Sequence, residues 1–191
     1  TPLEVGDRIT WSVAASCGDC FFCNDGLPQK CERLFKYGHE RISERHPLSG
    51  GLAEHCHLAA GTTVVRLPSA LSDAVACPAN CATATVAAAI RYAGDCADRV
   101  VLIQGAGMLG LTAAAMARVA GAREVIVCDT VQERLPRAVS FGATRTACVT
   151  EGEGPLEATV AQIGAGRGVD VAIDVSGAPA AIESGIRLLR I

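Results

Sequence analysis

Four cysteines stand within fifteen residues near the start of the chain, at Cys17, Cys20, Cys23 and Cys31. Glycine, asparagine, aspartate and proline lie between them, and these residue types form tight turns. Four thiolates can close a tetrahedral Zn²⁺ site with no open position, which is typical of a structural rather than a catalytic zinc. An iron–sulfur cluster also uses four thiolates, but its usual runs have different spacing. We therefore predict a structural zinc, with disulfides or free thiols as the alternatives.

The other six cysteines are scattered along the chain. A disulfide framework is typical of short secreted proteins, whereas this chain has 191 residues and is rich in alanine and valine. The N-terminal sequence TPLEVGDRIT contains no basic region, apolar stretch or cleavage site of a secretory signal. A cysteine cluster beside scattered cysteines therefore indicates a metal site in a reducing compartment, and we expect a cytoplasmic protein.

Histidines offer weaker metal-site candidates. His55 and His57 would share one face of a strand over 51–58, because side chains alternate along a strand. A two-histidine metal site is one interpretation of this pair, and a half-exposed strand is the simpler one. For His39 we favour a surface or lobe-anchoring role over metal ligation.

A glycine-rich loop, GAGMLG, lies between an expected strand over 100–103 and an expected helix over 111–120. This context matches the dinucleotide-binding fingerprint, in which each glycine has a separate task. Gly105 allows the tight turn, Gly107 lets the backbone approach a pyrophosphate, and Gly110 lets helix and strand pack closely. A tight turn without a ligand is the alternative.

Different residues are expected to bind the pyrophosphate and the adenosine ribose of a dinucleotide. Its phosphates would lie on the backbone N–H groups around Met108 and Leu109, at the N-terminus of the helix. Asp129 ends the next strand, nineteen residues after Gly110. A carboxylate at this spacing accepts hydrogen bonds from the adenosine ribose and repels a 2′-phosphate, which favours NAD over NADP. Arg134 is the nearby base that could contact the same ribose edge.

The pattern of expected strands and helices changes near residue 70. Short segments separated by turns come first and predict strands of an antiparallel domain, over 8–14, 51–58 and 62–66. Strands then alternate with helices, which predicts a parallel sheet with helices on both faces. The expected strands are 100–103, 124–128, 146–149 and 169–175, and the expected helices are 81–93, 111–120, 133–141, 155–163 and one from Pro179.

Charge and hydropathy exclude some partners. Twenty acidic and seventeen basic residues give a net charge of −3, and no basic block is present to bind a phosphate backbone, so we expect no nucleic acid partner. Two uncharged runs, 74–90 and 100–117, approach membrane-spanning length. The first contains Pro78 and Asn80, and the second contains Gln104 and the loop glycines, so we expect neither to cross a bilayer.

These features, in this order, resemble the zinc-dependent medium-chain dehydrogenase/reductase superfamily, which includes alcohol, sorbitol and threonine dehydrogenases. The resemblance extends over nearly the whole chain, and its matching segments are GDRI, the four-cysteine lobe, GGLAE, the Cys77/Cys81 segment, GAGMLG and Asp129. More narrowly, WSVAASCGDCFFC, KYGHE and PANCATATVAAAI are similar to a bacterial clade of alcohol dehydrogenases associated with phosphonate catabolism. The resemblance implies an α/β fold, with a partial GroES-like antiparallel domain over 1–78 and a C-terminally truncated Rossmann domain over 79–191.

The resemblance also implies catalytic residues. Cys81 matches the third ligand of a catalytic zinc, with a buried helix cysteine as the alternative, and Thr85 matches a residue beside the nicotinamide ring. Ser176-Gly177 matches a loop near the cofactor. The Gly-His-Glu segment around His39 comes after the cysteines, whereas in the family it precedes them. The family's first two catalytic ligands would lie before Thr1, so we expect an internal piece of a longer protein that is inactive by itself.

For the complete protein the resemblance implies a zinc-dependent, NAD-linked alcohol dehydrogenase that forms a homodimer or homotetramer. Its substrate would be a small alcohol or polyol, or the corresponding aldehyde or ketone. One alternative is a zinc-free quinone or enoyl reductase of the same fold, against which Asp129 and the cysteine lobe both argue. The other is a non-catalytic nucleotide-binding module that retains only the structural zinc.

Overall fold

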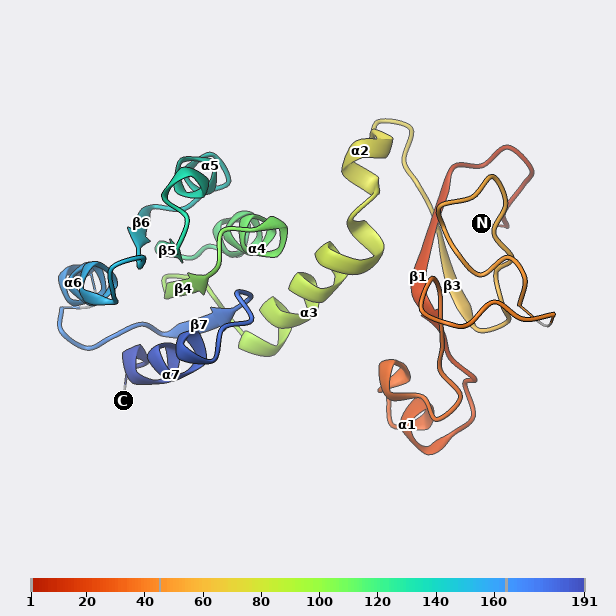
Figure 1. Cartoon of the computed structure of the whole chain (residues 1–191), viewed down its shortest axis with the longest axis horizontal. Helices are drawn as coiled ribbons and strands as arrows, with labels where there is room; N and C mark the ends of the chain where they lie inside the picture. Colours follow the sequence, from red (N-terminus) through yellow and green to blue (C-terminus); the bar gives the residue numbers. More distant parts are fainter. Residues whose placement is uncertain (1, 45, 164, 191) are drawn as a thin grey trace. The chain divides into compact units, whose positions relative to one another are not determined.

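The computed structural model describes residues 2–44, 46–163 and 165–190. It divides into two compact units, Thr1–Cys81 and Ala82–Ile191, each of which contains its own β-sheet (Figure 1). The fold class expected from the sequence, an antiparallel sheet followed by a parallel α/β sheet, is confirmed.

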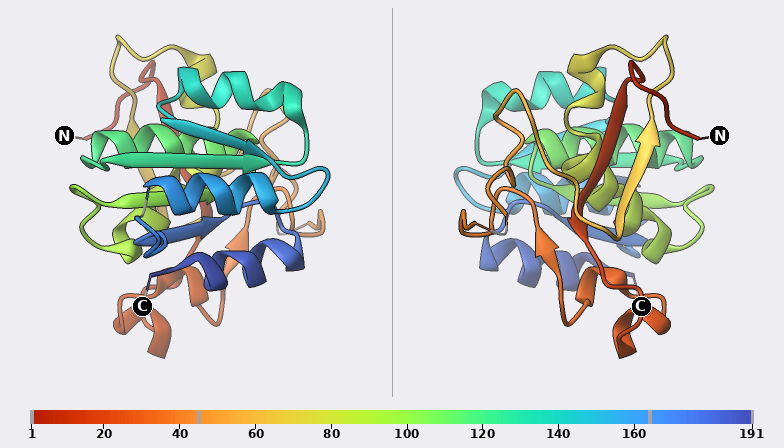
Figure 2. Two further views of the ribbon diagram at one scale, coloured as in Figure 1. Left: turned by 90° about the vertical axis from the view of Figure 1, so that its left-hand side faces the viewer. Right: turned by 90° about the vertical axis from the view of Figure 1, so that its right-hand side faces the viewer.

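The first unit contains a three-stranded antiparallel sheet in the order β2-β1-β3. Its strands are β1 (Ile9–Ala15), β2 (Phe35–Lys36) and β3 (Thr62–Arg66). The β-branched and aromatic residues of β1 and β3 suit a pleated, half-buried surface, and Trp11 pairs with Val64 in their register. In the right-hand view of Figure 2 these two strands lie side by side, in red and yellow.

The strand expected over 51–58 is wrong. Residues 51–54 form bends and the backbone from 55 to 58 is irregular. Both sides of β1 are already taken by β2 and β3, and the segment's His57 amide donates to the carbonyl of Leu48 (2.8 Å) rather than to a strand. His55 and His57 therefore share no strand face.

The second unit contains a four-stranded sheet in the order β6-β5-β4-β7, with every neighbouring pair parallel. The strands are β4 (Val100–Gln104), β5 (Glu124–Asp129), β6 (Arg145–Cys148) and β7 (Val171–Asp174). The chain moves outward from β4 to β6 and then crosses to the other side of β4 for β7. This reversal creates a topological switch point at the carboxyl ends of β4 and β7, where doubly wound sheets bind ligands.

Helices cover both faces of this sheet (Figure 1). On one face lie α3 (Ala84–Ala93), α4 (Met108–Val119) and α5 (Leu135–Ser140), and on the other α6 (Gly154–Ile163) and α7 (Pro179–Leu188). Because alternate side chains of a strand point to opposite faces of the sheet, β4 and β5 each supply residues to both cores. The first core takes Val101, Ile103, Val125 and Val127, and the second takes Val100, Leu102, Ile126 and Cys128.

The helix expected over 81–93 begins later and less regularly. A short helix, α2 (Asp73–Ala76), is followed by a π-helical turn over Ala79–Thr83, and α3 starts at Ala84. Pro78 has no N–H to donate, so regular hydrogen bonding cannot continue through it. By length and composition alone, the helical run Asp73–Ala93 could cross a membrane, a test that a core helix of a soluble protein also passes.

Candidate functional site

The four clustered cysteines meet in a small lobe that contains α1 (Phe21–Asn24) and a 3₁₀ turn, Pro28–Lys30. Their sulfur atoms all lie within 4.8 Å of one another. Cys17 and Cys31 are 3.4 Å apart, Cys17 and Cys23 3.9 Å, and Cys20 and Cys31 4.0 Å. A tetrahedral site with Zn–S bonds of about 2.3 Å separates its sulfurs by about 3.8 Å, whereas a disulfide bond measures about 2.05 Å. The donor set and its spacing therefore fit one zinc held by four thiolates.

Backbone amides of the lobe point at the sulfurs. The N–H groups of Cys17 and Arg33 each donate to Cys31 Sγ at 3.3 Å, and the Cys17 amide is the main cause that lowers the pKa of Cys31. The backbone amide of Glu32 is the main cause that lowers the pKa of Cys20 to about 6. Hydrogen bonds to a thiolate favour its charged form, and the thiolate is the form that binds metal.

The three loop glycines meet different surroundings after β4. Gly105 has a φ of +109°, and a Cβ there would lie 3.1 Å from the Ser176 nitrogen. A Cβ on Gly110 would lie 1.8 Å from the carbonyl oxygen of Gly105, so no side chain fits. A Cβ on Gly107 would meet no atom within 4 Å. The protein itself therefore leaves no room for a side chain at Gly105 and Gly110, whereas the space beside Gly107 is open.

The helix α4 begins at Met108, three residues earlier than expected, with Gly107 as its N-cap. Gly107 has no side chain with which to cap the first N–H groups of the helix. The first N–H groups of a helix have no partner within it, so those of Met108 and Leu109 are available to an anion beside the open position at Gly107.

Asp129 links the end of β5 to this loop. Its side chain is buried, with Oδ2 accepting from the Ala106 amide (2.7 Å) and Oδ1 from the Val131 amide (2.8 Å). The exposed Arg134 approaches the same carboxylate at 3.7 Å. A carboxylate oxygen can accept more than one hydrogen bond, so Asp129 can hold the loop and also receive a ribose hydroxyl. The loop-holding role was not foreseen from the sequence.

The carboxyl ends of β4 and β7 meet at this loop. The Val175 amide donates to the Gln104 carbonyl (3.0 Å), and Ser176 donates through its amide and hydroxyl to Asp174 Oδ1 (3.0 and 2.6 Å). A buried hydrogen bond from Gln104 to Ser184 (2.8 Å) fixes α7 to the end of β4. The glycine loop thus lies at the switch point of the sheet.

Two further residues predicted from the sequence, Cys81 and Thr85, belong to neither the four-cysteine lobe nor the glycine loop. Cys81 is exposed within the π-helical turn, and Thr85 is exposed in the first turn of α3. Within the described residues the four-cysteine cluster is the one group of three or more metal-ligating side chains. Cys81, His39 and His57 belong to no such group, and His39 Nδ1 lies 3.0 Å from the Tyr37 carbonyl oxygen at the surface.

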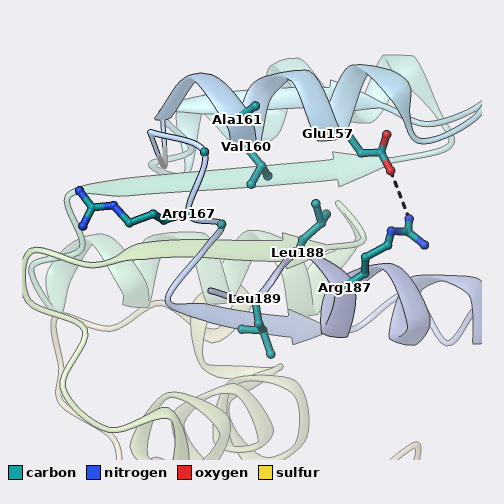
Figure 3. A pocket seen from close by; sticks show the side chains of 9 residues that line it. Glu157, Val160, Ala161, Arg167, Arg187, Leu188 and Leu189 are labelled. Atoms are coloured by element: carbon teal, nitrogen blue, oxygen red, sulfur yellow. Dashed lines mark hydrogen bonds and ion pairs between the residues drawn. The ribbon is translucent and has the colours of Figure 1, made fainter. Parts of the chain in front are cut away.

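A groove of about 460 Å³ between α6 and α7 contains none of these residues (Figure 3). Arg187 of α7 reaches across it to Glu157 of α6, at 3.4 Å, and also pairs with Glu153. Arg187 and Glu157 therefore satisfy each other's charge, and the remaining charged side chain of the lining, Arg167, does not converge with them on one point (Figure 3).

Comparisons with known proteins agree with this architecture. A family profile described as zinc-binding dehydrogenase matches residues 109–191. L-threonine 3-dehydrogenase of Vibrio parahaemolyticus is 33% identical over 95% of this chain and 50% of its own length. An alcohol dehydrogenase from Thermotoga maritima superposes with a TM-score of 0.92 at 33% identity, over 98% of this chain and 53% of that one. A structure from Sinorhizobium meliloti, described as that of a zinc-binding dehydrogenase bound to NADP, superposes with a TM-score of 0.81 at 27% identity, over all of this chain and 53% of that one.

The similarity to these dehydrogenases, in sequence and in fold, extends over nearly the whole chain, including the glycine loop and the four-cysteine lobe of this chain. The chain belongs to the zinc-dependent medium-chain dehydrogenase/reductase superfamily. It spans about half the length of the curated relatives it matches.

Proposed function

We propose that this chain forms the structural-zinc lobe and the dinucleotide-binding half of a zinc-dependent, NAD-linked alcohol dehydrogenase. The complete protein would transfer hydride between a small alcohol or polyol and NAD, and would assemble as a homodimer or homotetramer in the cytoplasm, without nucleic acid or membrane partners. Its domains would be a GroES-like domain that includes residues 1–78 and a Rossmann domain that includes 79–191.

The observation that supports this proposal best is the open position at Gly107. Gly105 and Gly110 are needed to fold the loop, since a Cβ on either would meet backbone atoms within 3.1 Å. Among the residues that the structure describes, no atom lies close enough to a Cβ on Gly107 to require the third glycine. A bound pyrophosphate would require it, because a pyrophosphate needs close approach to a backbone without a side chain.

Each remaining residue takes a role from its surroundings. The amides of Met108 and Leu109 would bind the pyrophosphate at the N-terminus of α4. Asp129 would accept from the ribose hydroxyls, with Arg134 lying along the same edge. A 2′-phosphate would meet the buried Asp129 carboxylate at short range, which supports NAD over NADP. Bound NAD supplies the hydride acceptor, and these residues hold its adenosine half in place.

The metal residues divide into two roles. Cys17, Cys20, Cys23 and Cys31 would hold a structural zinc that stabilises the lobe. Cys81 would supply one ligand of a catalytic zinc, whose chemistry when bound is to polarise the substrate oxygen, and Thr85 would lie beside the nicotinamide. A π-helical turn at Cys81 is consistent with a functional site, since such turns are frequent there.

A second candidate function is a nucleotide-binding module without catalysis. It is favoured by one observation, that Cys81 joins no cluster of metal-ligating side chains in the described part of the chain. A complete gene product with an upstream Cys and an upstream Gly-His-Glu segment would support the enzyme, and the lack of either would support the module.

Equilibrium titration with NAD and NADP tests the proposal on the chain itself. Quenching of its single tryptophan, or calorimetry, should give saturable NAD binding and at least tenfold weaker NADP binding, the factor expected of one repelled phosphate. Equal affinity would overturn the assignment of Asp129, and no binding of either nucleotide by folded protein would overturn the dinucleotide site.

A further inference from the structure

A groove of about 570 Å³ lies directly beside the four-cysteine lobe. It runs along the end of β1, and Ser16, Asp19, Arg33 and His46 line it together with one cysteine of the cluster, Cys17. The other three cluster cysteines do not line it. The groove therefore gives small molecules from solvent access to one cysteine of the metal site, Cys17.

The four thiols also differ in exposure and spacing. Cys17 and Cys23 are half-buried, whereas Cys20 and Cys31 are buried. Of the three sulfur–sulfur distances given above, that between Cys17 and Cys31 is the shortest, at 3.4 Å. A reagent that enters the groove would thus meet Cys17 first, with the buried Cys31 directly behind it.

Arg33 also lines this groove, together with Cys17. It pairs with Asp19. A guanidinium has five N–H donors, so the pairing with Asp19 leaves donors for another group at the mouth of the groove. A free guanidinium donor at this place can hydrogen-bond the oxygen that leaves when a peroxide reacts with a cysteine in the groove.

We propose that Cys17 is an oxidation site through which hydrogen peroxide opens the metal lobe, forming a Cys17–Cys31 disulfide and releasing zinc. The inference rests on the zinc occupancy proposed above. Its placement comes from the groove, the 3.4 Å sulfur separation and the position of Arg33.

The chemistry balances in two steps. The Cys17 thiolate attacks one peroxide oxygen, the O–O bond breaks, and hydroxide leaves to become water by taking a proton, with Arg33 donating to the departing oxygen. The Cys31 thiolate then attacks the Cys17 sulfenic acid sulfur, the S–O bond breaks, and a second hydroxide takes a proton. Two thiolates lose two electrons in total and peroxide gains them. Zn²⁺ leaves unchanged in oxidation state, because two thiolates remain where four were needed.

Peptide mapping after treatment of the zinc-loaded chain with one equivalent of hydrogen peroxide tests the proposal. Combined digestion with trypsin and a protease that cleaves before aspartate places Cys17 on peptide 9–18, Cys31 on peptide 31–33, and the two other cluster cysteines on peptide 19–24. The expected first product is the cross-link between peptides 9–18 and 31–33, formed in step with zinc release measured by a chromogenic chelator.

A matched pair of arginine variants separates this mechanism from general thiol oxidation. Arg33→Ala should hold the same zinc per chain but release it about tenfold more slowly, the factor for losing one charge-assisted hydrogen bond. Arg41→Ala, an exposed arginine that does not line the groove, should match the unmodified chain.

Three results would overturn the inference: a first cross-link that joins peptides 19–24 and 31–33, zinc retained after Cys17 has been oxidised, or an unchanged rate in Arg33→Ala. A chain that contains no zinc before treatment would overturn the metal site as well. These outcomes distinguish a failure of the oxidation site from a failure of the proposed structural zinc.

Discussion

Substituting alanine for Gly107 and, separately, for Gly110 applies the same chemical change at two points of one loop. At Gly107 the backbone is extended (φ −79°, ψ −170°) and the added Cβ meets no atom within 4 Å. At Gly110 the added Cβ lies 1.8 Å from the Gly105 carbonyl oxygen. The structure therefore predicts that one variant loses cofactor affinity and the other loses stability.

The magnitudes follow from the surroundings. Restricting the unfolded chain at Gly107 stabilises by about 0.4–1 kcal/mol, and alanine is a poorer N-cap than glycine by roughly the same amount. We therefore expect the free energy of unfolding to change by less than about 1 kcal/mol. A methyl group pressed against the pyrophosphate should cost about 1–3 kcal/mol of binding, as overpacking does, which weakens NAD binding about 5- to 150-fold. In Gly110→Ala the backbone must move, so we expect at least about 3 kcal/mol of destabilisation and a melting temperature lower by about 6–12 °C.

Urea unfolding and NAD titration of both variants check these values, with the unsubstituted chain as reference. The reasoning would be refuted by Gly107→Ala binding NAD within twofold of the reference. It would equally be refuted by Gly110→Ala unfolding at the reference urea concentration, because the close contact at Gly110 would then not exist.

Three further predictions concern other parts of the chain. Asp129→Ala should weaken NAD binding and bring the NAD and NADP affinities together, because it removes the carboxylate that repels a 2′-phosphate; an unchanged ratio in the titration would contradict the ribose assignment. Removing zinc with a chelator should lower the melting temperature and expose 17–31 to proteolysis, since structural zinc contributes folding free energy; a metal-free chain that melts like the loaded one would contradict this. Burial raises the pKa of Cys128 to about 12, so at pH 8 its thiol stays protonated and should resist iodoacetamide while the exposed Cys77 reacts; equal alkylation rates by mass spectrometry would contradict the burial.

The sequence predicted best where a local pattern determines the structure. In the parallel sheet β4, β5 and β7 are short, largely apolar runs bounded by turns, and the observed strands β4 to β7 overlap the expected ranges. The glycine loop was also predictable, because the close approach of Gly110 to the Gly105 carbonyl lies within the loop itself, although the approach of Gly105 to Ser176 joins distant residues.

The sequence predicted least where the structure depends on contacts between residues far apart in the chain. The segment 51–58 alternates like a strand, but a strand forms only by pairing with a neighbour, and residue order does not reveal that His57 donates to the Leu48 carbonyl instead of to a strand. The two-residue strand β2 has too short a pattern to detect and exists only because β1 lies beside it. In the same way, the hydrogen bond between Asp129 and the Ala106 amide joins residues 23 apart in sequence, so the loop-holding role of Asp129 needed coordinates.

The zinc content of the chain, measured by elemental analysis of protein purified under reducing conditions, tests the account most directly. One number decides both whether four thiolates form a closed metal site and whether Cys81 lacks partner ligands within this chain. The account predicts one zinc per chain. Two would contradict the incomplete catalytic site by showing that Cys81 has found further ligands, and none would contradict the four-cysteine metal site itself.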